Sequence, residues 1–296
     1  MKVLDFGSLN YDNVYELDHI ILPGETETSG ALSLFLGGKG LNQAIALAKA
    51  GVTVYLAGQI GEDGDDFLEA CRAAGVRTDY LKKVPGKSGH TVIQLDKNGQ
   101  NSIILFGGAN RSQTRENMDD VLSHFEKDDI LLIQNEINEL PYLIDRAYDR
   151  GMRIVLNPSP YDEGLDACDL EKVAVFLLNE VEGFQLTGSR EEEEILEGVA
   201  KRFPDAVCVL TLGEKGAVYR KGHDRVVQAA FPVTPVDTTA AGDTFTGYFI
   251  AGYTEGMPVH EILRMASKAA SVACTRMGAA GSIPLREEVE RLLRTE

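Results

Sequence analysis

The stretch GLNQAIALAKAGVTVYLA, residues 40–57, joins two different hydrophobic patterns. Its first part is helical, because its larger apolar residues recur at the spacing of one helix face: Leu41, Ala44, Ile45 and Ala48. Gly51 then supplies a helix end. The following run, 52–57, is nearly continuous in apolar residues, as in a parallel strand covered on both faces. A helix leading into a buried strand is the repeating unit of α/β folds.

Similar apolar runs recur along the chain. They predict further buried strands at 3–6, 129–134, 153–157, 173–179 and 206–212. Helical patterns lie between them at 140–151 and 189–203, and Ser189 with Glu192 has the spacing of a capping box. This alternation predicts a doubly wound α/β fold with a mainly parallel central sheet flanked by helices.

Two stretches, residues 13–35 and 88–110, break the alternation. Both have the period of strands, with turn signals at Pro23-Gly24 and Asn98-Gly99, and no helix separates their strands. They predict a small antiparallel sheet set apart from the main one, such as a lid or an oligomer contact.

The charge balance restricts the kinds of partner. The formal net charge is −17, and such a field repels polyanions, which argues against nonspecific binding to nucleic acid or an anionic membrane. A small anion can still be held by local backbone N–H groups. The four cysteines show no metal or redox spacing, so we expect small core residues. With no secretory signal and no long apolar run, we expect a cytoplasmic protein.

The segment LGGKGLNQA, 36–44, combines glycines with polar residues just before a helix. It matches neither the P-loop nor the dinucleotide fingerprint. Its glycines allow a ligand to approach the backbone closely, and Lys39 and Asn42 can offer hydrogen bonds. The alternative is a plain turn and helix start.

The segment DTTAAGDTFTG, 237–247, also leads into a helix. Free N–H groups of a first helical turn form an anion site, and the small residues Ala240, Ala241 and Gly242 leave room for a phosphate. Asp243 has the chemistry to accept a proton from an attacking hydroxyl. The alternative is that it only caps the helix.

Polar residues follow two predicted strands at their carboxyl ends, where open α/β sheets bind ligands. Asn10 and Asp12 come after the first strand and would lie on one side of the chain. Asn179 and Glu182 close another strand, and their oxygens suit a hydrated Mg²⁺. Each pair alone is also common in turns and on surfaces. The histidines and serines form no HExxH or GxSxG pattern, so zinc and serine hydrolases have no support.

Taken together, the motifs occur in a familiar order: GSLNYD, PGET, GGKGLNQA, GGAN, NPSP, NEVE, TLGEKG, DTTAAGDTF and TRMGAAGSIP. This order resembles the ribokinase (PfkB-type) family of sugar kinases over essentially the whole chain. The resemblance implies a single ribokinase-like domain, residues 1–296, whose β lid is formed by about 13–35 and 88–110. In this family such a lid commonly joins two subunits, so a homodimer is expected.

The resemblance also implies an activity. The expected reaction transfers phosphate from ATP to the primary hydroxyl of a small sugar, first of all D-ribose to give ribose 5-phosphate. Fructose, another ketose, a sugar acid and a nucleoside stay open as acceptors. A sugar-binding regulator without catalysis is the alternative from another class, and no nucleic acid or membrane partner is implied.

Carried over by motif, the resemblance assigns the acceptor side of the site. The sugar would contact Asn10, Asp12, Gly38, Lys39, Asn42, Glu136 and Asp243. Asp243 would be the catalytic base. The backbone amides of Ala240, Ala241, Gly242 and Asp243 would form the anion hole.

The resemblance assigns the nucleotide and metal sites in the same way. ATP would meet Asn179, Thr211, Gly213, Gly216 and Gly242. Mg²⁺ would lie near Asn179 and Glu182, held through water. A monovalent cation, K⁺, would take oxygens from Asp237, Thr239, Ala273, Arg276, Gly278 and Ser282.

Three departures from the family pattern concern substrate choice and the nucleotide side of the site. Tyr11 stands where a smaller residue is usual, which allows a different sugar pocket. LLNE replaces the usual TPNE, and residues 266–268 hold no His or Asn near the expected adenine.

Overall fold

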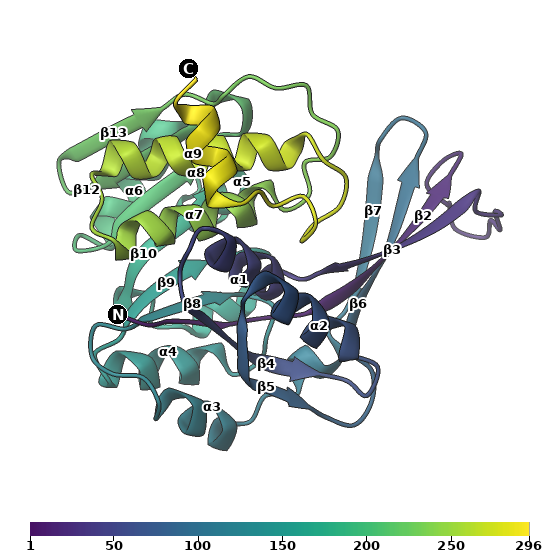
Figure 1. The fold of residues 1–296 in the computed structure, drawn as a ribbon, viewed down its shortest axis with the longest axis horizontal. Helices are drawn as coiled ribbons and strands as arrows, with labels where there is room; N and C mark the ends of the chain where they lie inside the picture. The colour runs from purple at the N-terminus through teal and green to yellow at the C-terminus, as the bar shows by residue number, and fades with distance from the viewer. Residues whose placement is uncertain (296) are drawn as a thin grey trace.

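The computed structural model describes residues 1–295, and its centre is one large sheet (Figure 1). The strands of this sheet are β1 (Val3–Phe6), β4 (Val54–Ile60), β5 (Arg77–Lys83), β8 (Ile130–Gln134), β9 (Arg153–Asn157), β10 (Val173–Asn179), β11 (Val207–Thr211), β12 (Ala217–Lys221) and β13 (Asp224–Gln228). Their order is β13-β12-β11-β10-β9-β8-β1-β4-β5. Neighbours from β11 to β5 pair in parallel, and β12 and β13 add an antiparallel edge.

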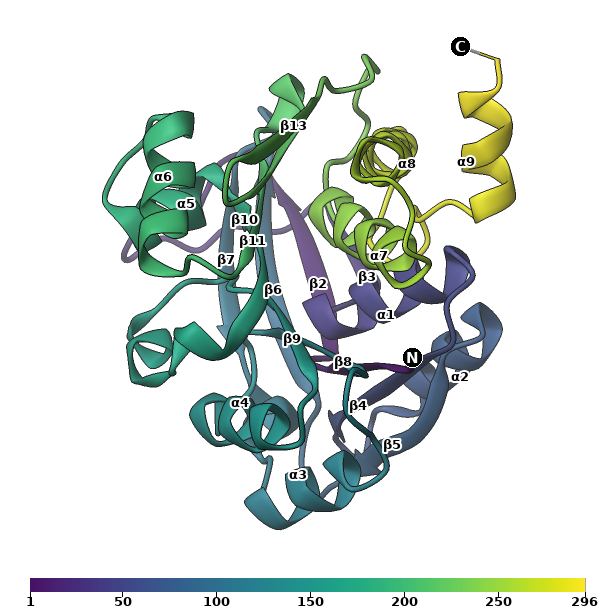
Figure 2. The same cartoon turned by 90° about the vertical axis from the view of Figure 1, so that its left-hand side faces the viewer.

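Helices cover both faces of this sheet (Figure 2). One apolar core packs under α1 (Lys39–Lys49), α2 (Asp65–Ala74), α7 (Ala241–Thr254), α8 (Val259–Cys274) and α9 (Arg286–Leu293). The other packs under α3 (Arg115–Leu122), α4 (Leu140–Asp149), α5 (Glu180–Thr187) and α6 (Glu192–Arg202). Short 3₁₀ turns span Gly108–Arg111, Glu163–Ala167, Leu170–Lys172 and Gly213–Lys215. The continuous apolar runs are buried because both faces are covered. The prediction of a doubly wound fold is confirmed.

A second, four-stranded sheet projects from this body (Figure 1). It contains β2 (Asn10–Leu17), β3 (Ala31–Gly37), β6 (Gly89–Asp96) and β7 (Asn101–Phe106), in the order β3-β2-β6-β7. We call this sheet the lid. It matches the separate sheet expected from the sequence, but begins at Asn10 instead of residue 13. The expectation of an antiparallel sheet is wrong for its central pair, because β2 and β6 run in parallel. Both strands leave the body in the same direction, each following a parallel strand of the main sheet.

Local signals at two helix starts differ from the expectation. The predicted capping box of Ser189 and Glu192 is absent, since α6 has Glu191 at its N-cap. Ser189 Oγ accepts from the backbone N–H of Glu191 at 3.2 Å, which makes a turn before the helix. The true capping box lies at the start of α5. No helix within residues 1–295 is long and apolar enough to cross a membrane.

Candidate active site

The residues singled out in the sequence gather at the carboxyl ends of the parallel strands. Two adjoining cavities lie there, a polar one of about 240 Å³ and a larger one of about 560 Å³. Both are lined by Thr211 at the end of β11 and by Gly242 at the start of α7. Open α/β sheets bind their ligands at this edge.

Asp243 lies in the first turn of α7 and is only 7% exposed. Its carboxylate accepts a hydrogen bond from Asn42 Nδ2 at 2.9 Å and one from Gln43 Nε2 at 2.8 Å. It therefore does not cap its own helix; the N-cap is Ala240, in the left-handed region at φ 59°. Two amides of α1 hold this acid in place. Gln43 was missed from the sequence, although it lies inside the NQA motif.

The N-terminal turn of α7 is open to an anion. Ala240 has no side chain that can accept from the first helical N–H groups, so a ligand can take these bonds. Ala241 and Gly242 line the larger cavity, and nothing lies within 4 Å of a Cβ placed on Gly242. The small residues thus leave the space that the sequence predicted.

Asn10 is fixed at the base of the lid and is 3% exposed. Its Oδ1 accepts from Asn110 Nδ2 at 2.8 Å. Asn110 Oδ1 in turn accepts from the backbone N–H of Leu9 at 3.0 Å. Asn110 is a second site residue that was not predicted from the sequence, because nothing in GGAN indicates a role for its side chain.

Asp12 lies on the same side of β2 as Asn10 and is the second acid of the site, after Asp243. Its Oδ1 accepts from Thr91 Oγ1 at 2.7 Å. Burial raises the pKa of Asp12, the bond from Thr91 lowers it, and the charges of Glu136 and Asp243 raise it again, with a net increase. Three carboxylates therefore lie within electrostatic reach of one another between the lid and the body.

Glu136 follows β8 and is held by the loop after β1. It accepts a short hydrogen bond from Ser8 Oγ, and its Oε2 also accepts from the backbone N–H of Lys39 at 3.2 Å. Asn42 has a buried Oδ1 without a partner among the described residues. The site thus offers several acceptors that a bound hydroxyl group can satisfy.

Two glycines of the GGKG segment are required by space. A Cβ on Gly37 would lie 2.1 Å from Asp12 Oδ2. Gly38 has φ 92°, and its Cβ would lie 2.9 Å from the Cα of Leu9. These positions let β3 and the start of α1 close tightly around Asn10 and Asp12.

Lys39 lies in the polar cavity, together with Asn179, Glu182 and Asp243. Burial lowers its pKa, but the charges of Asp243, Glu136 and Glu182 outweigh this, and the pKa is raised. The lysine is therefore a fixed positive charge between the acid of α7 and the end of β10.

Asn179 and Glu182 form the capping box of α5. Asn179 Oδ1 accepts from the N–H groups of Val181 and Glu182, and both Glu182 oxygens accept from Asn179, at 2.9 Å each. Because the two side chains already hydrogen-bond each other, they are better suited to contact Mg²⁺ through its bound water than to ligate it directly. Across residues 1–295, no group of three or more His, Cys, Asp or Glu is placed to hold a metal.

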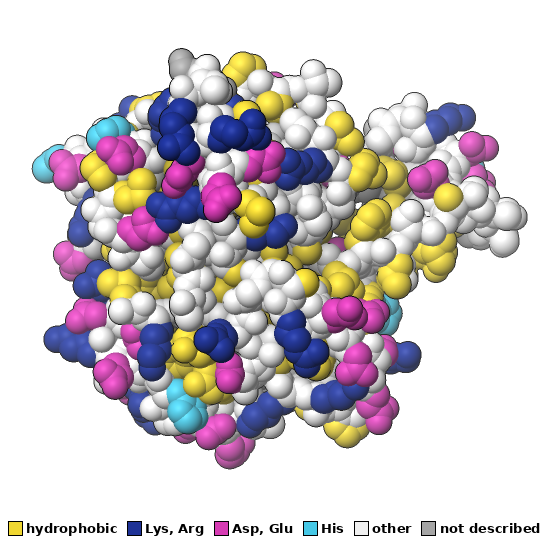
Figure 3. All heavy atoms as spheres, in the orientation of Figure 1, with side chains coloured by type: hydrophobic (Ala, Val, Ile, Leu, Met, Phe, Trp, Pro, Cys, Tyr) yellow, Lys and Arg dark blue, Asp and Glu magenta, His cyan; other side chains and the backbone are white. Residues whose placement is uncertain are grey.

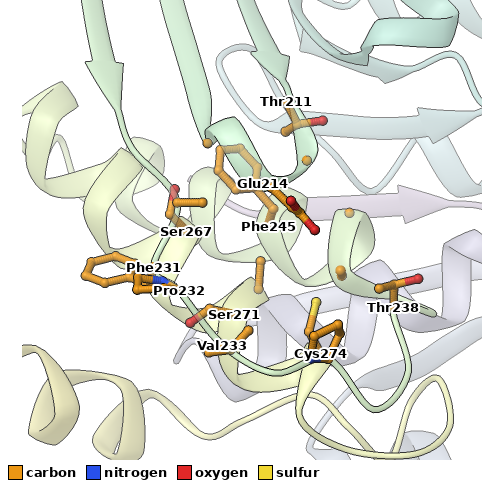
Figure 4. A pocket seen from close by; sticks show the side chains of 17 residues that line it. Thr211, Glu214, Phe231, Pro232, Val233, Thr238, Phe245, Ser267, Ser271 and Cys274 are labelled. Carbon is orange, nitrogen blue, oxygen red and sulfur yellow. The ribbon is translucent and has the colours of Figure 1, made fainter.

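The larger cavity has mostly apolar walls (Figure 4). Phe231, Pro232 and Val233 line one part of it, and Phe245 of α7 lies near its junction with the polar cavity. Thr211, Gly213 and Gly216 line it too, as the nucleotide assignment requires. Its size and walls suit a flat, largely apolar group such as a purine.

The residues expected around a monovalent cation are joined by hydrogen bonds. Asp237 accepts from the N–H groups of Thr239 at 2.8 Å and Gly278 at 2.9 Å. Arg276 donates from its backbone to Ala273 O at 3.1 Å and from its guanidinium to Ser282 O at 3.5 Å. These bonds hold the two loops together, and the loops carry the kind of carbonyl oxygens that can replace the hydration shell of K⁺.

Tyr11 does not lie in the wall of the sugar pocket, where the sequence placed it. Strand alternation turns its ring away from Asp12, and the ring packs on Phe67 with centroids 4.4 Å apart. Its hydroxyl donates to the backbone oxygen of Asp63 at 2.6 Å. The interpretation of Tyr11 as a different wall of the sugar pocket is therefore wrong; it anchors the lid to the region around α2.

Comparisons with known proteins give one consistent result. Residues 2–286 match the model of the pfkB family carbohydrate kinases. The chain is 36% identical over 291 residues to a ribokinase of Bacillus subtilis, covering 97% of each. It is 30% identical to a deoxyribokinase of Salmonella typhi over 99% of each. A solved structure of Arabidopsis thaliana ribokinase complexed with ribose and ATP matches with a TM-score of 0.88 at 32% identity, covering 99% of this chain and 98% of that one.

Proposed function

The chain belongs to the pfkB family of carbohydrate kinases, and from this premise we propose that it phosphorylates D-ribose with ATP to give ribose 5-phosphate. The enzyme class is a phosphotransferase with an alcohol group as acceptor. The observation that carries the proposal is the position of Asp243, a buried carboxylate held by two amides at the front of an open helix end.

In the proposed reaction, Asp243 removes the proton of the primary hydroxyl as that oxygen attacks the γ-phosphate. General-base catalysis of this kind contributes roughly 10²–10⁴-fold. Asn42 and Gln43 keep both carboxylate oxygens in fixed directions. Asn10, Asp12 and Glu136 would hold the other hydroxyl groups of the sugar against the lid.

The transferring phosphate would lie in the polar cavity. The N–H groups at the start of α7 and the charge of Lys39 would stabilise the negative charge that spreads over its oxygens. When bound beside Asn179 and Glu182, Mg²⁺ would supply further charge neutralisation on the phosphates. The nucleotide would place its base in the larger cavity near Phe231 and Val233.

The acids of the site favour a neutral polyol as acceptor. Asp12, Glu136 and Asp243 accept hydrogen bonds from sugar hydroxyls, but they would repel the carboxylate of a sugar acid. The sugar acid is therefore the weakest of the kinase alternatives.

A coupled assay of ADP release tests the substrate. We expect kcat/KM to be highest for ribose, and lower by roughly 10–100-fold for deoxyribose, because loss of one hydroxyl leaves a charged acceptor unpaired. Fructose, a sugar acid and nucleosides complete the panel. A clear preference for one of these would replace ribose in the proposal. Ribose binding without ADP release on any acceptor would instead favour the non-catalytic regulator.

The cation loops give a second prediction. Initial rates in K⁺ should exceed those in a large organic cation, tetramethylammonium, at equal ionic strength, because only K⁺ can order the oxygens around Asp237 and Gly278. The sodium salt serves as a size control. Equal rates in all three salts would remove the monovalent cation from the proposal.

We also propose that two chains pair through the lid, whose strands carry exposed apolar residues. The four free cysteines and the use of ATP favour the cytoplasm as the working compartment.

A further inference from the structure

A chain of side-chain hydrogen bonds connects Asp243 with the interior of the main sheet. Gln43 Nε2 donates to Asp243 Oδ1 at 2.8 Å, and Gln134 Nε2 donates to Gln43 Oε1 at 2.8 Å. Gln134 Nε2 also donates to Asp5 Oδ1 at 3.0 Å. The three inner residues, from α1, β8 and β1, are at most 1% exposed. The connection is therefore shielded from water along its length.

The carboxyl groups of Asp243 and Asp5 at the two ends determine which way each glutamine amide is turned. A carboxamide donates two hydrogens, and Gln43 uses both, on Asp243 Oδ1 and on Asn157 Oδ1 at 3.2 Å. If its amide turned over, its carbonyl oxygen would face the carboxylate of Asp243. The bond received from Gln134 opposes this turn, because it fixes the carbonyl of Gln43 on the other side.

Asp5 is the last acceptor in this chain of hydrogen bonds. Gln134 uses both of its hydrogens, on Gln43 and on Asp5, whereas its own Oε1 has no partner among the described residues. Without an acceptor at Asp5, Gln134 keeps only one bond and can turn its amide. Its carbonyl oxygen would then meet the carbonyl of Gln43, and the hold on Asp243 would loosen.

An acid at this place needs an explanation, because packing alone disfavours it. Asp5 is fully buried, its strand neighbours are Leu56 and Leu132, and its Oδ2 has no partner among the described residues. A buried polar atom without a partner is destabilising, because it has lost its hydrogen bonds to water. Burial raises the pKa of Asp5 well above its usual range, the bond from Gln134 lowers it, and the charge of Asp243 raises it further. Asp5 is thus harder to ionise than an acid exposed to solvent.

We infer that Asp5 is a positioning residue, acting through two buried glutamines on the orientation of the Asp243 carboxylate. The inference rests on the proposed kinase activity with Asp243 as its base. It adds that catalysis depends on an acceptor atom in β1 that touches neither substrate nor nucleotide.

Two substitutions of Asp5 separate this role from packing. Asp5→Val removes the acceptor, and we expect kcat to fall about 10-fold with the KM for ribose unchanged, since only base orientation is lost. The melting temperature should change by no more than roughly 3 °C, because the lost hydrogen bond and the gained apolar packing oppose each other. Asp5→Asn keeps an acceptor of the same shape and should retain kcat within about threefold.

A double-mutant cycle tests whether Asp5 acts through the glutamines. Gln43→Met removes the hydrogen-bond link next to Asp243. Adding Asp5→Val to this variant should therefore lower kcat no further. Gln134→Leu removes the middle hydrogen-bond link and should lower kcat by the same factor as Asp5→Val. It tests the same connection if Asp5→Val does not fold. The matched control is Asp129→Asn, a buried acid just before β8, at the amino-terminal end of the strands, that accepts from the Lys2 N–H at 2.6 Å. It should lower the melting temperature and leave kcat unchanged.

Unchanged kcat in Asp5→Val or Gln134→Leu would overturn the inference. So would equal losses in Asp5→Val and Asp5→Asn, or losses that multiply in the double mutant. These outcomes leave the kinase proposal intact, because the unmodified chain still releases ADP. Failure of the kinase proposal would show instead as no turnover by the unmodified chain on any acceptor.

Discussion

Asp243→Asn should lower kcat on ribose by about 10²–10⁴-fold while the KM for ribose changes little. A carboxamide cannot take the proton of the attacking hydroxyl, but it keeps the shape of the acid. Its oxygen can still accept from Gln43, as Oδ1 does now. Its new amino group would face the amino group of Asn42, whose Oδ1 has no partner at present. A turn of the Asn42 amide therefore restores the second bond, and the fold should survive.

The measurement combines steady-state kinetics with calorimetric titration of ribose into the variant. Ribose binding within a few fold of the unmodified chain, together with a collapse of kcat, separates catalysis from binding. Thr254→Ala, on the last turn of the same helix and far from the reacting atoms, is the control for α7. Turnover of Asp243→Asn near the original rate would mean that another group is the base.

Much of the fold could be predicted from the sequence, because its buried strands are nearly continuous runs of apolar residues. Runs such as 129–134 and 173–179 are apolar except at their ends and coincide with β8 and β10 within one residue. The strands β5, β12 and β13 were missed because they lie at or near the sheet edges and carry charges, as in RTDYLKK and DRVVQ. These strands show neither a continuous apolar run nor a regular alternation of apolar and polar residues, so only their pairing with a neighbouring strand identifies them.

The candidate site divides along a similar line. Several residues of the quoted motifs lie together in the structure, among them Asn42, Lys39 and Asp243, although Gln43 and Asn110 of the same motifs were given no role. The residues that support them were missed. Gln134 and Asp5 have meaning only once β1, β8 and α1 are neighbours in space, so no local spacing shows their connection. Tyr11 was misinterpreted for a related reason, since its direction depends on which face of β2 meets α2.

Charging the lid should separate the subunits of the proposed dimer. Within residues 1–295, the two edge strands of the lid expose six large apolar side chains, each 42–62% exposed: Leu32 and Leu34 on β3, and Ile103, Ile104, Leu105 and Phe106 on β7. We call this set the apolar lid patch, and Figure 3 shows hydrophobic atoms along the projecting sheet. Large apolar side chains gathered on an exposed surface mark sites of association. The edge strand β7 contributes four of these residues, so it is the place to test.

The double substitution Ile103→Lys and Ile104→Lys puts one charge on each face of β7, so it acts whichever face the partner covers. Burying an unpaired charge costs several kcal/mol, and we expect the dimer dissociation constant to rise by at least about 100-fold. Analytical ultracentrifugation over a concentration series gives the masses of both proteins. Val227→Lys, a 55% exposed valine on the strand β13 at the edge of the main sheet, is the matched control and should stay dimeric. The single variants then show which face is covered, because only one of them should dissociate. A monomeric unmodified chain, or a double variant that remains dimeric, would rule out association through this patch.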